Sequence, residues 1–322
     1  KILIANRGEI AVRIIRAARE LGIATVAVYS TADKEALHTL LADEAICIGP
    51  AKSTDSYLNM NAVLSAAVLT EAEAIHPGFG FLSENSKFAT MCEEVGVKFI
   101  GPSGAIMDMM GDKINARAQM IKANVPVIPG SDGEVFTAEE ALEVAEKIGY
   151  PVMLKASAGG GGKGIRKVEK AEDLVAAFES ASSEAKAAFG NGAMYMERVI
   201  YPARHIEVQI LADQHGHVVH LGERDCSLQR NNQKVLEEAP SVAIGKTLRQ
   251  KIGDAAVRAA QSVGYENAGT IEFLYDENKG EIYKVPAYSI SASEIEEIEL
   301  RKIKLKNHIA NIQIKTGIII AK

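Results

Sequence analysis

Hydrophobic and polar positions follow two different periods along roughly the first hundred residues. The β-strands predicted by short apolar runs span residues 2–5, 25–29, 45–48, 74–76 and 98–100. Apolar residues at helical spacing predict helices over residues 9–21 and 59–69, and Gly22 is placed to end the first helix. Strands that alternate with helices in this way are typical of a parallel sheet with helices on both faces.

Two loops follow strands of this predicted sheet. Residues 6–9 read Asn-Arg-Gly-Glu, and residues 76–81 read His-Pro-Gly-Phe-Gly-Phe. Ligands of open parallel sheets bind beyond the carboxyl ends of the strands. Both loops are therefore expected at the ligand-binding edge of the sheet.

The pattern changes after about residue 108. Residues 109–122 read as a helical connector and 125–135 as a loop, and Thr137 and Glu140 have capping-box spacing at the start of a helix that ends at residue 148. The later predicted elements are strands at 151–155, 164–168, 194–199, 205–211, 217–223, 270–275 and 281–285, with helices at 171–189 and 247–263. The fold class is thus α/β, or α+β overall, with a Rossmann-like parallel sheet followed by antiparallel strands.

A run of glycines between residues 157 and 164 carries the first chemical signal. It is not a Walker A loop, because Lys163 is followed by Gly164 and not by Ser or Thr. The residues after it read as a strand, so the glycines are expected to cap a β-hairpin. Glycine has no Cβ, so its backbone can adopt positive φ angles and approach an anion closely. A nucleotide-phosphate cradle and a hairpin tip without a ligand both remain open.

Charged residues near the predicted strands bear on this choice. Lys155 ends the strand before the glycine run, and Lys113 lies near a helix start. Two ammonium groups with backbone amides supply what a triphosphate needs. Glu272 alternates with Ile271 and Phe273 in a predicted strand, where its oxygens could hold magnesium. A solvated surface position is the alternative for each of the three.

Composition excludes several classes of function. The 322 residues carry a formal net charge of −6 with a pI of about 5.8, which argues against a nucleic-acid binder. No apolar run has the length of a membrane span, and the chain opens on a strand and not on a signal peptide. Cys47, Cys92 and Cys226 form no disulfide or zinc pattern. A cytoplasmic protein without membrane or nucleic-acid contact is expected.

Longer stretches of the sequence resemble one known family. The stretches are IANRGEIAVRIIRAARELG, EAIHPGFGFLSEN, FIGPS, MGDK, GYPVMLKASAGGGGKGIRKV, YMERVI, RHIEVQIL, ERDCSLQR and GTIEFLY. In this order they resemble the biotin carboxylase branch of the ATP-grasp enzymes, most closely the biotin carboxylase subunit of bacterial acetyl-CoA carboxylase. The resemblance covers residues 1 to about 283, and the tail at 286–322 does not match.

The resemblance implies an ATP-dependent ligase reaction. Bicarbonate attacks the γ-phosphate of ATP to give carboxyphosphate, and the CO2 that it yields is captured by the biotin of a biotin carboxyl carrier protein. This is the first half-reaction of acetyl-CoA carboxylase in fatty acid synthesis. The implied cofactors and substrates are ATP, Mg2+ (or Mn2+), bicarbonate and biotin. The implied partners are the carrier protein, carboxyltransferase subunits and a second copy of the chain in a homodimer.

The resemblance also implies a division of the chain. Residues 1–108 would form the N-terminal biotin carboxylase domain, 109–126 a helical connector, 127–200 the ATP-grasp lid subdomain and 201–285 the ATP-grasp core strands. Residues 286–322 would be a non-matching tail in place of the C-terminal domain of the family.

Functional residues follow position by position from the matching stretches. Lys234, Gln229 and Glu207 would be catalytic, with Lys234 attracting bicarbonate, and Glu272 would carry the metal. The residues that the resemblance places at the nucleotide are Lys113, Lys155, Gly161, Gly162, Lys163, Glu197, Arg198, Val199, Ile200, His205, Asn232 and Leu274.

Within this nucleotide set, the resemblance implies several separate tasks. Amides of Gly161 and Gly162 would bind phosphates in a lid over ATP, and Lys113 and Lys155 would hold phosphate oxygens. Glu197 and the backbone through Ile200 would recognise adenine. His205 would contact the ribose, with Gln229 nearby.

Two departures from the family pattern stand out. Asn231 and Asn232 replace an arginine and a histidine between Gln229 and Lys234, which removes charge from an anion-binding segment. After Tyr283 the family continues Phe-Ile-Glu-Met-Asn-Thr-Arg, whereas this chain reads Lys284-Val-Pro-Ala-Tyr-Ser-Ile. Pro286 therefore stands where a second metal carboxylate is expected. The tail pairs an acidic run at 294–299 with a basic run at 301–306, a pattern more typical of a solvated helix face than of a membrane or nucleic-acid contact.

Alternatives of other classes remain. A catalytically incomplete ATP-binding fragment would bind nucleotide without turnover, and the chain could belong to another biotin-dependent carboxylase such as pyruvate carboxylase. Another carboxylate–amine ligase of the ATP-grasp type is opposed by the stretches HPGFGFLSEN and RHIEVQIL. A nicotinamide-dependent oxidoreductase is disfavoured, because the glycine run does not follow the first strand.

Overall fold

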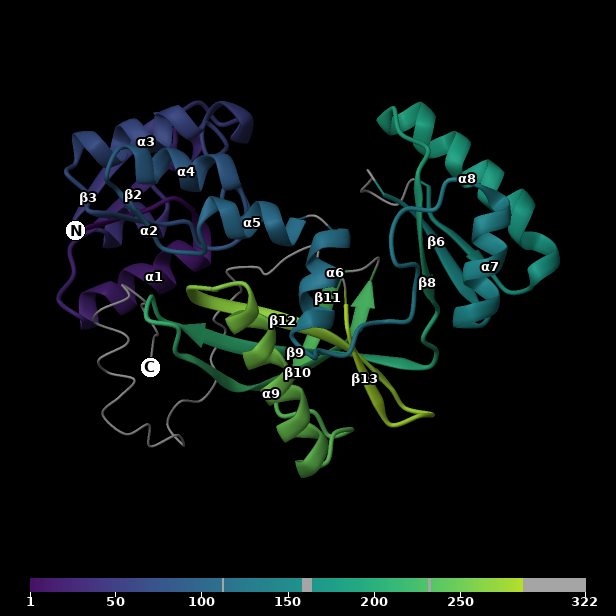
Figure 1. The fold of residues 1–322 in the computed structure, drawn as a ribbon. Helices are drawn as coiled ribbons and strands as arrows, with labels where there is room; N and C mark the ends of the chain where they lie inside the picture. The colour runs from purple at the N-terminus through teal and green to yellow at the C-terminus, as the bar shows by residue number, and fades with distance from the viewer. Residues whose placement is uncertain (112, 158–163, 231–232, 286–322) are drawn as a thin grey trace.

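The computed structural model describes residues 1–111, 113–157, 164–230 and 233–285 (Figure 1). Three groups of elements are visible. A parallel sheet with its helices lies at the upper left, a smaller sheet with α7 and α8 at the right, and a larger sheet with α9 below and between them. No helix among the described residues is long and apolar enough to cross a bilayer.

The first group is a five-stranded parallel sheet in the order β3-β2-β1-β4-β5. Its strands are β1 (Ile2–Ile4), β2 (Thr25–Ser30), β3 (Glu44–Gly49), β4 (Ala74–His76) and β5 (Lys98–Phe99), and its helices are α1 (Gly8–Glu20), α2 (Leu37–Leu41), α3 (Met60–Leu69) and α4 (Ser86–Glu94). Short 3-10 turns lie at Thr31–Asp33 and Ser53–Asp55. The predicted strands and the helices over 9–21 and 59–69 are confirmed, whereas α2 and α4 were not predicted.

Successive residues of β1 face opposite cores of this sheet. Leu3 packs with Val63 of α3 and Phe88 of α4, whereas Ile4 packs with Ile15 of α1. Side chains of a strand alternate between the two faces of a sheet, so both faces of β1 are covered. The prediction of helices on both faces is confirmed.

The two loops expected at the ligand-binding edge lie against each other. Asn6 is buried, and its Nδ2 donates to the carbonyls of Pro77 at 2.8 Å and Phe79 at 2.7 Å. Gly78 has a φ of 64°, and a Cβ there would lie 2.8 Å from that amide nitrogen. The contact follows from β1 and β4 being parallel neighbours, whose carboxyl ends meet at one edge.

The predicted connector consists of two helices, α5 (Gly104–Gly111) and α6 (Lys113–Lys122). Both supply side chains to the core beneath the larger sheet, among them Met110 and Met120. A buried hydrogen bond also links the parallel sheet to the larger one. Asn267, at the start of the strand that carries Glu272, donates from Nδ2 to the carbonyl of Gly101 at 2.8 Å.

The smaller antiparallel sheet has the order β7-β6-β8. Its elements are α7 (Ala138–Ile148), β6 (Val152–Ala156), β7 (Arg166–Val168), a 3-10 turn (Ala171–Asp173), α8 (Leu174–Phe189) and β8 (Met194–Arg198). Val152 pairs with Val168 and Leu154 with Arg166, so the strands on either side of the glycine run are antiparallel as predicted. Residues 158–163 themselves lie outside the described residues.

The larger antiparallel sheet has the order β11-β10-β9-β12-β13. Its elements are β9 (Ala203–Ala212), β10 (Val218–Arg230), β11 (Gln233–Glu238), α9 (Lys246–Ser262), β12 (Asn267–Asp276) and β13 (Glu281–Lys284). The prediction that β10 ends at residue 223 was wrong, and β11 was not predicted. β10 continues to Arg230 because, beyond residue 223, it pairs with β9 as far as Asp225 and with β11 from Asp225 onward.

Alternation along β9 gives this sheet one apolar and one polar face. Ile206, Val208 and Ile210 are buried in the core beneath α9. His205 and Glu207 lie between them in sequence and therefore point to the opposite face. The polar face is also covered, since Glu207 is buried as well.

We expect the capping box of α7 to contribute measurably to stability. Thr137 Oγ1 accepts from the Glu140 N–H at 3.2 Å, and Glu140 Oε2 accepts from the Thr137 N–H at 3.4 Å. Thr137→Ala should lower the free energy of unfolding by about 1 kcal/mol, measured by urea unfolding monitored by circular dichroism. Thr137→Ser is the control because it keeps the hydroxyl, and equal losses in both variants would contradict the assignment.

Candidate active site

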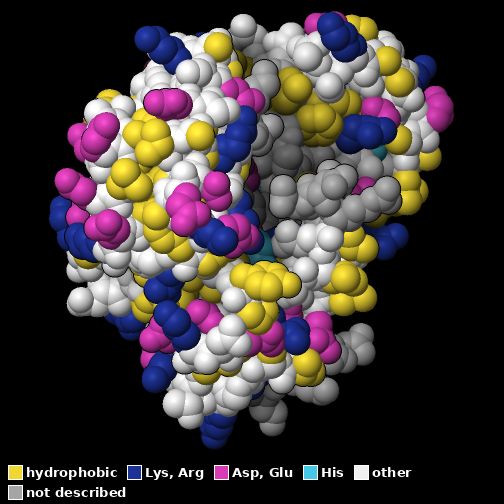
Figure 2. Space-filling view, turned by 90° about the vertical axis from the view of Figure 1, so that its right-hand side faces the viewer, with side chains coloured by type: hydrophobic (Ala, Val, Ile, Leu, Met, Phe, Trp, Pro, Cys, Tyr) yellow, Lys and Arg dark blue, Asp and Glu magenta, His cyan; other side chains and the backbone are white. Residues whose placement is uncertain are grey.

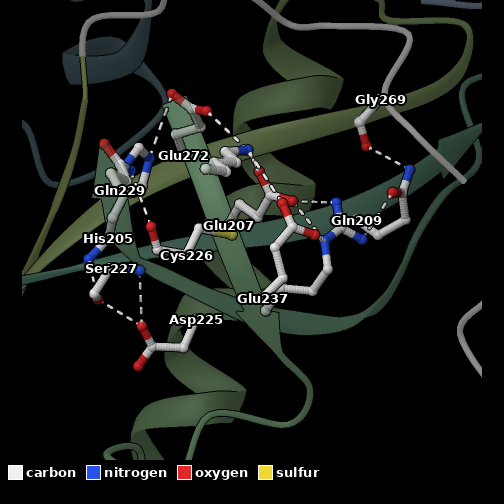
Figure 3. A network of polar contacts seen from close by, with 12 residues as sticks. His205, Glu207, Gln209, Asp225, Cys226, Ser227, Gln229, Glu237, Gly269 and Glu272 are labelled. Carbon is white, nitrogen blue, oxygen red and sulfur yellow. Dashed lines mark hydrogen bonds and ion pairs between the residues drawn. The ribbon is translucent and has the colours of Figure 1, made fainter. Parts of the chain in front are cut away.

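The polar face of the larger sheet gathers charged side chains from four strands (Figure 3). Glu207 of β9 lies opposite Arg224 of β10 on one side and opposite Glu272 of β12 on the other. Gln229 of β10 lies opposite Lys234 of β11. Residues directly opposite each other in an antiparallel pair share a face, so the register of the sheet brings these groups together.

Glu207 lies at the centre of this group. Its side chain is 2% exposed, and its carboxylate contacts both the guanidinium of Arg224 and the ammonium of Lys234. Arg224 Nη1 also donates to Gln209 Oε1 at 3.2 Å. A buried carboxylate is stable only when it is paired and hydrogen-bonded, and here each of its two oxygens contacts one cation.

Lys234 is surrounded by carboxylates. Its Nζ lies 3.6 Å from Glu272 Oε1 and 4.0 Å from Glu237 Oε1, in addition to its contact with Glu207. Burial alone would lower the pKa of Lys234, but the hydrogen bond and the charge of Glu207 raise it above its ordinary value. The ammonium is therefore charged at neutral pH.

His205 links Gln229 to Glu272. Gln229 Nε2 lies 2.9 Å from the carbonyl of Cys226 and 2.7 Å from His205 Nδ1. The amide group has two N–H donors, so Nδ1 accepts one of them and the network assigns the proton of neutral His205 to Nε2. His205 Nε2 lies 3.5 Å from Glu272 Oε2 and has no hydrogen-bond partner within the described part of the chain.

Glu272 carries its negative charge in this arrangement. Burial raises its pKa, but the contact with His205 and the charge of Lys234 outweigh burial and bring the pKa below its ordinary value. Its contacts with His205 Nε2 and Lys234 Nζ are long, at 3.5 and 3.6 Å. Its oxygens thus remain available to a hard cation such as magnesium, the ion that prefers carboxylate oxygen.

A second group of possible metal ligands is already paired with cations of the protein. Among the described residues, ligand atoms of Glu207, Cys226 and Glu237 lie within 4.8 Å of one another. Arg224 Nε lies 3.5 Å from Glu237 Oε2, and Lys234 also lies among these carboxylates. Burial raises the pKa of the Cys226 thiol well above its usual range, which disfavours the thiolate that metals bind. Protein cations therefore hold this group together.

A further ion pair lies within the smaller sheet, between its neighbouring strands β6 and β8. Lys155 of β6 contacts Glu197 of β8, whose side chain is 2% exposed. Glu197 Oε1 has no hydrogen-bond partner among the described residues although it is buried. A buried acceptor without a donor is costly, so this oxygen is the place where an external N–H donor would be stabilised.

The segment after Glu197 lines the same region. The N–H groups of Arg198 and Val199 donate to the carbonyls of Pro129 and Pro151, each at 2.8 Å, so these donors are committed within the protein. Ile200 and Leu274 belong to an apolar cluster with Ile128 and Tyr283. The segment after Glu197 therefore packs through Ile200 against apolar side chains of β12 and β13.

Several predicted site residues lie outside the described residues. These are Gly161, Gly162, Lys163 and Asn232, and two departures from the family pattern, at Asn231 and Pro286, lie outside them as well. Lys113 begins α6, but its side chain is not among those described. Their roles remain predictions. Figure 2 shows that the molecule is hollowed near the upper centre of the face turned toward the viewer, with charged and hydrophobic side chains around the rim.

Arg224, Gln209 and Glu237 were missed in the sequence. The run Glu223-Arg224-Asp225 reads as the polar end of a strand, although all three side chains are buried in the structure. Three charged residues after an apolar stretch, within the matching segment ERDCSLQR, are the signal that could have found Arg224. Charged residues are fully buried almost only when they are paired.

Lys284 is a buried cation at the end of β13, where the resemblance places phenylalanine. It is 3% exposed, and its Nζ donates to the carbonyl of Val285 at 2.8 Å. Burial lowers the pKa of Lys284 to about 8, against the opposing charges of Glu272 and Glu197. Because the ordinary value is 10.5, the folded protein releases this proton before the unfolded chain does.

The sequence matches known protein families over most of its length. A model described as biotin carboxylase, N-terminal domain, matches residues 1–107, and one described as carbamoyl-phosphate synthase L chain, ATP binding domain, matches residues 112–287. Biotin carboxylase 1 of Bacillus subtilis (strain 168) is 57% identical over 283 residues, which are 88% of this chain and 63% of that protein.

Solved structures give the same result. The crystal structure of a biotin carboxylase–β,γ-ATP complex from Campylobacter jejuni has a TM-score of 0.83 at 48% identity and covers 100% of this chain and 72% of that chain. The biotin carboxylase domain dimer of Hydrogenobacter thermophilus 2-oxoglutarate carboxylase, in complex with MgADP, ADP and bicarbonate, has a TM-score of 0.78 at 49% identity, covering 93% and 65%.

Fold and site together define a protein of the ATP-grasp class, in which an ATP-binding domain follows a Rossmann-like domain along the chain. The chain belongs to the biotin carboxylase family, as the resemblance of its sequence implied. It spans 63% of the length of the first curated relatives that it matches, and that match ends near residue 283.

We expect Lys284 to make stability rise with pH. Between about pH 8 and 10.5 the unfolded chain binds more protons at this position than the folded one, so the free energy of unfolding should increase across that window. Lys284→Met should raise it by up to about 3 kcal/mol at pH 7 and have a smaller effect near pH 10.5.

Urea unfolding between pH 7 and 10.5 measures the effect of Lys284→Met. Lys279→Met in the exposed turn before β13 is the matched control and should change neither stability nor its pH dependence. A destabilised Lys284→Met protein at pH 7 would contradict the cost assigned to this buried ammonium.

Proposed function

We propose that this chain supplies the biotin carboxylase reaction, the ATP-dependent carboxylation of biotin on a carrier protein with bicarbonate. The observation that carries the proposal is the group of Glu272, Lys234, Glu207, His205 and Gln229 on one sheet face, in a chain of this family. The group offers a hard carboxylate beside a charged ammonium, which suits phosphoryl transfer from ATP to an anion.

The nucleotide would lie between the smaller sheet and the larger one. The orphaned Glu197 Oε1 supports adenine recognition, because the 6-amino group of adenine is an N–H donor. Ile200 and Leu274 would contact the base, and His205 the ribose. Lys155 lies next to Glu197 and would be shared between that carboxylate and the phosphates.

The predicted phosphate-binding set completes this arrangement. Lys113, Lys163 and the amides of Gly161 and Gly162 would cover the phosphates, as the family resemblance implies. Magnesium at Glu272 would neutralise negative charge on the phosphates. The complexes of relatives with a β,γ-ATP ligand and with MgADP and bicarbonate support these ligands.

At the acceptor end, Lys234 would attract bicarbonate. Glu207 would hold Lys234 in place, and Gln229 would fix the orientation of His205. Bicarbonate would attack the γ-phosphate to give carboxyphosphate and ADP, and the CO2 released with phosphate would be captured by the biotin ureido nitrogen. The predicted role of Asn232 in the same segment belongs to this proposal.

The division into domains, the partner proteins and the compartment are also part of this proposal. We divide the chain into a biotin carboxylase N-terminal domain (1–108), connector (109–126), lid (127–200) and core (201–285). The intact protein would form a homodimer and work with a biotin carboxyl carrier protein and carboxyltransferase subunits, as in acetyl-CoA carboxylase. Free thiols at Cys47, Cys92 and Cys226 support a reducing compartment such as the cytoplasm.

A second candidate is an ATP-binding protein without turnover. Pro286 stands where the family has a second metal carboxylate, and a single carboxylate is weak support for a metal–triphosphate complex. This candidate shares the nucleotide site and differs only in the acceptor chemistry.

Turnover distinguishes the two candidates. We expect ATP hydrolysis that depends on bicarbonate and increases with free biotin, measured by phosphate release. Glu272→Gln should reduce it at least tenfold, because the hard anionic ligand is lost. Glu277→Gln, in the turn after β12, is the matched control. Nucleotide binding without bicarbonate-dependent hydrolysis would favour the second candidate.

Base recognition by Glu197 gives a separate prediction. The 6-oxo group of guanine only accepts hydrogen bonds, so it should be repelled where the 6-amino group of adenine is bound. The protein should bind ATP at least tenfold more tightly than GTP in isothermal titration. Glu197→Gln should weaken ATP about tenfold and narrow this preference, since glutamine can donate to guanine.

The control for base recognition is Glu169→Gln. Glu169 is exposed and pairs with Lys167 at the end of β7. Glu169→Gln therefore removes one negative charge from the smaller sheet, as Glu197→Gln does, but away from the proposed adenine site. An unchanged ratio of ATP to GTP affinity in Glu197→Gln would place the base elsewhere.

A further inference from the structure

Lys234 lies close enough to Glu272 for its positive charge to act on a metal ion that binds this carboxylate. Its ammonium is 3.6 Å from Glu272 Oε1 and also contacts Glu207, and Figure 3 shows these carboxylates on one face of the sheet. Two cations at one carboxylate repel each other, and water screens this repulsion only in part, since the side chains of Lys234 and Glu272 are 29% and 17% exposed. Metal binding and the Lys234–Glu272 pair therefore oppose each other.

Glu207 gives Lys234 a second position that does not depend on Glu272. The carboxylate of Glu207 is fixed from its other side by Arg224, and Arg224 is itself fixed by Gln209. A lysine has three donors on a flexible stem, so its ammonium can move away from Glu272 while it keeps Glu207. The structure shows the arrangement in which Lys234 contacts Glu207 and lies 3.6 Å from Glu272, and the contact with Glu207 would allow a second one farther from Glu272.

We propose that Lys234 is a tethered cation that competes with the metal for Glu272, so that metal binding releases Lys234 to bind the anionic substrate. The inference rests on the proposed function in one respect, the assignment of Glu272 as the metal carboxylate. Coupling between two ligands is reciprocal. An anion bound at Lys234 therefore strengthens metal binding at Glu272 to the same degree.

Binding of Mn2+ to the full chain without nucleotide tests the competition. Electron paramagnetic resonance of free Mn2+ gives the dissociation constant without any catalytic step. Lys234→Met removes the competing charge and should tighten Mn2+ binding about tenfold, within the usual range of coupling between sites. Lys251→Met, on the exposed side of α9, removes one positive charge elsewhere and should leave the constant unchanged.

A second variant is expected to change the Mn2+ affinity in the opposite direction, so the test does not depend on the folding of Lys234→Met alone. Glu207→Gln weakens the second position of Lys234 and leaves the ammonium to Glu272, so Mn2+ should bind more weakly than in the unaltered protein. Bicarbonate, added at constant ionic strength, should tighten Mn2+ binding in the unaltered protein and have no such effect in Lys234→Met.

The outcomes separate this inference from the proposed function. If Glu272→Gln abolishes Mn2+ binding but Lys234→Met binds Mn2+ no more tightly than the unaltered protein, the competition is wrong and the metal assignment stands. If Glu272→Gln leaves Mn2+ binding unchanged, both the competition and the metal role of Glu272 are wrong. Saturable binding that neither Lys234→Met nor bicarbonate alters would also overturn the competition.

Discussion

The pairing of Glu207 with Arg224 and Lys234 is the interaction on which the site depends. A carboxylate that is 2% exposed carries a large desolvation cost unless cations lie beside it. The sheet provides them from β10 and β11, the strands that lie beyond β9 on one side. Removing either cation would leave this buried carboxylate with only one of its two positive partners, so the folding of these strands and the charge balance of the site depend on each other.

The same constraint orders the neighbouring groups. Lys234 brings its charge to Glu272, and Gln229 orients the ring of His205 toward the same carboxylate. Because Ile206 and Val208 on the other side of β9 lie in the core beneath α9, the strand cannot shift its register by one residue without burying Glu207 among apolar side chains. Hydrophobic packing on one face thus sets the geometry of the charges on the other.

Local patterns in the sequence predicted much of this fold. Alternating strands and helices indicated the parallel sheet, the Thr137–Glu140 spacing indicated the start of α7, and the residues after the glycine run indicated a hairpin. Alternation around Glu272 placed it correctly, opposite Ile271 and Phe273. These features depend on residues close together in sequence.

Other features depend on partners far away in sequence. Arg224 looks like the end of a strand until Glu207 is placed beside it, and β11 is recognisable only from its pairing with β10. The buried position of Lys284 has no local signal, since β13 alternates weakly over its four residues. For α4 a local signal existed, because Asn85 caps it by accepting from the Phe88 N–H, and it was not used.

The smaller sheet packs on its own core. Leu154, Val168 and Phe178 belong to a cluster that, among the described residues, shares none with the core beneath β9 to β13. A rigid-body rotation of this unit about the segments that join it would therefore expose little apolar surface of either core. Such a movement would carry only a small hydrophobic penalty, so the energy of a bound nucleotide would suffice to set the angle between the two units.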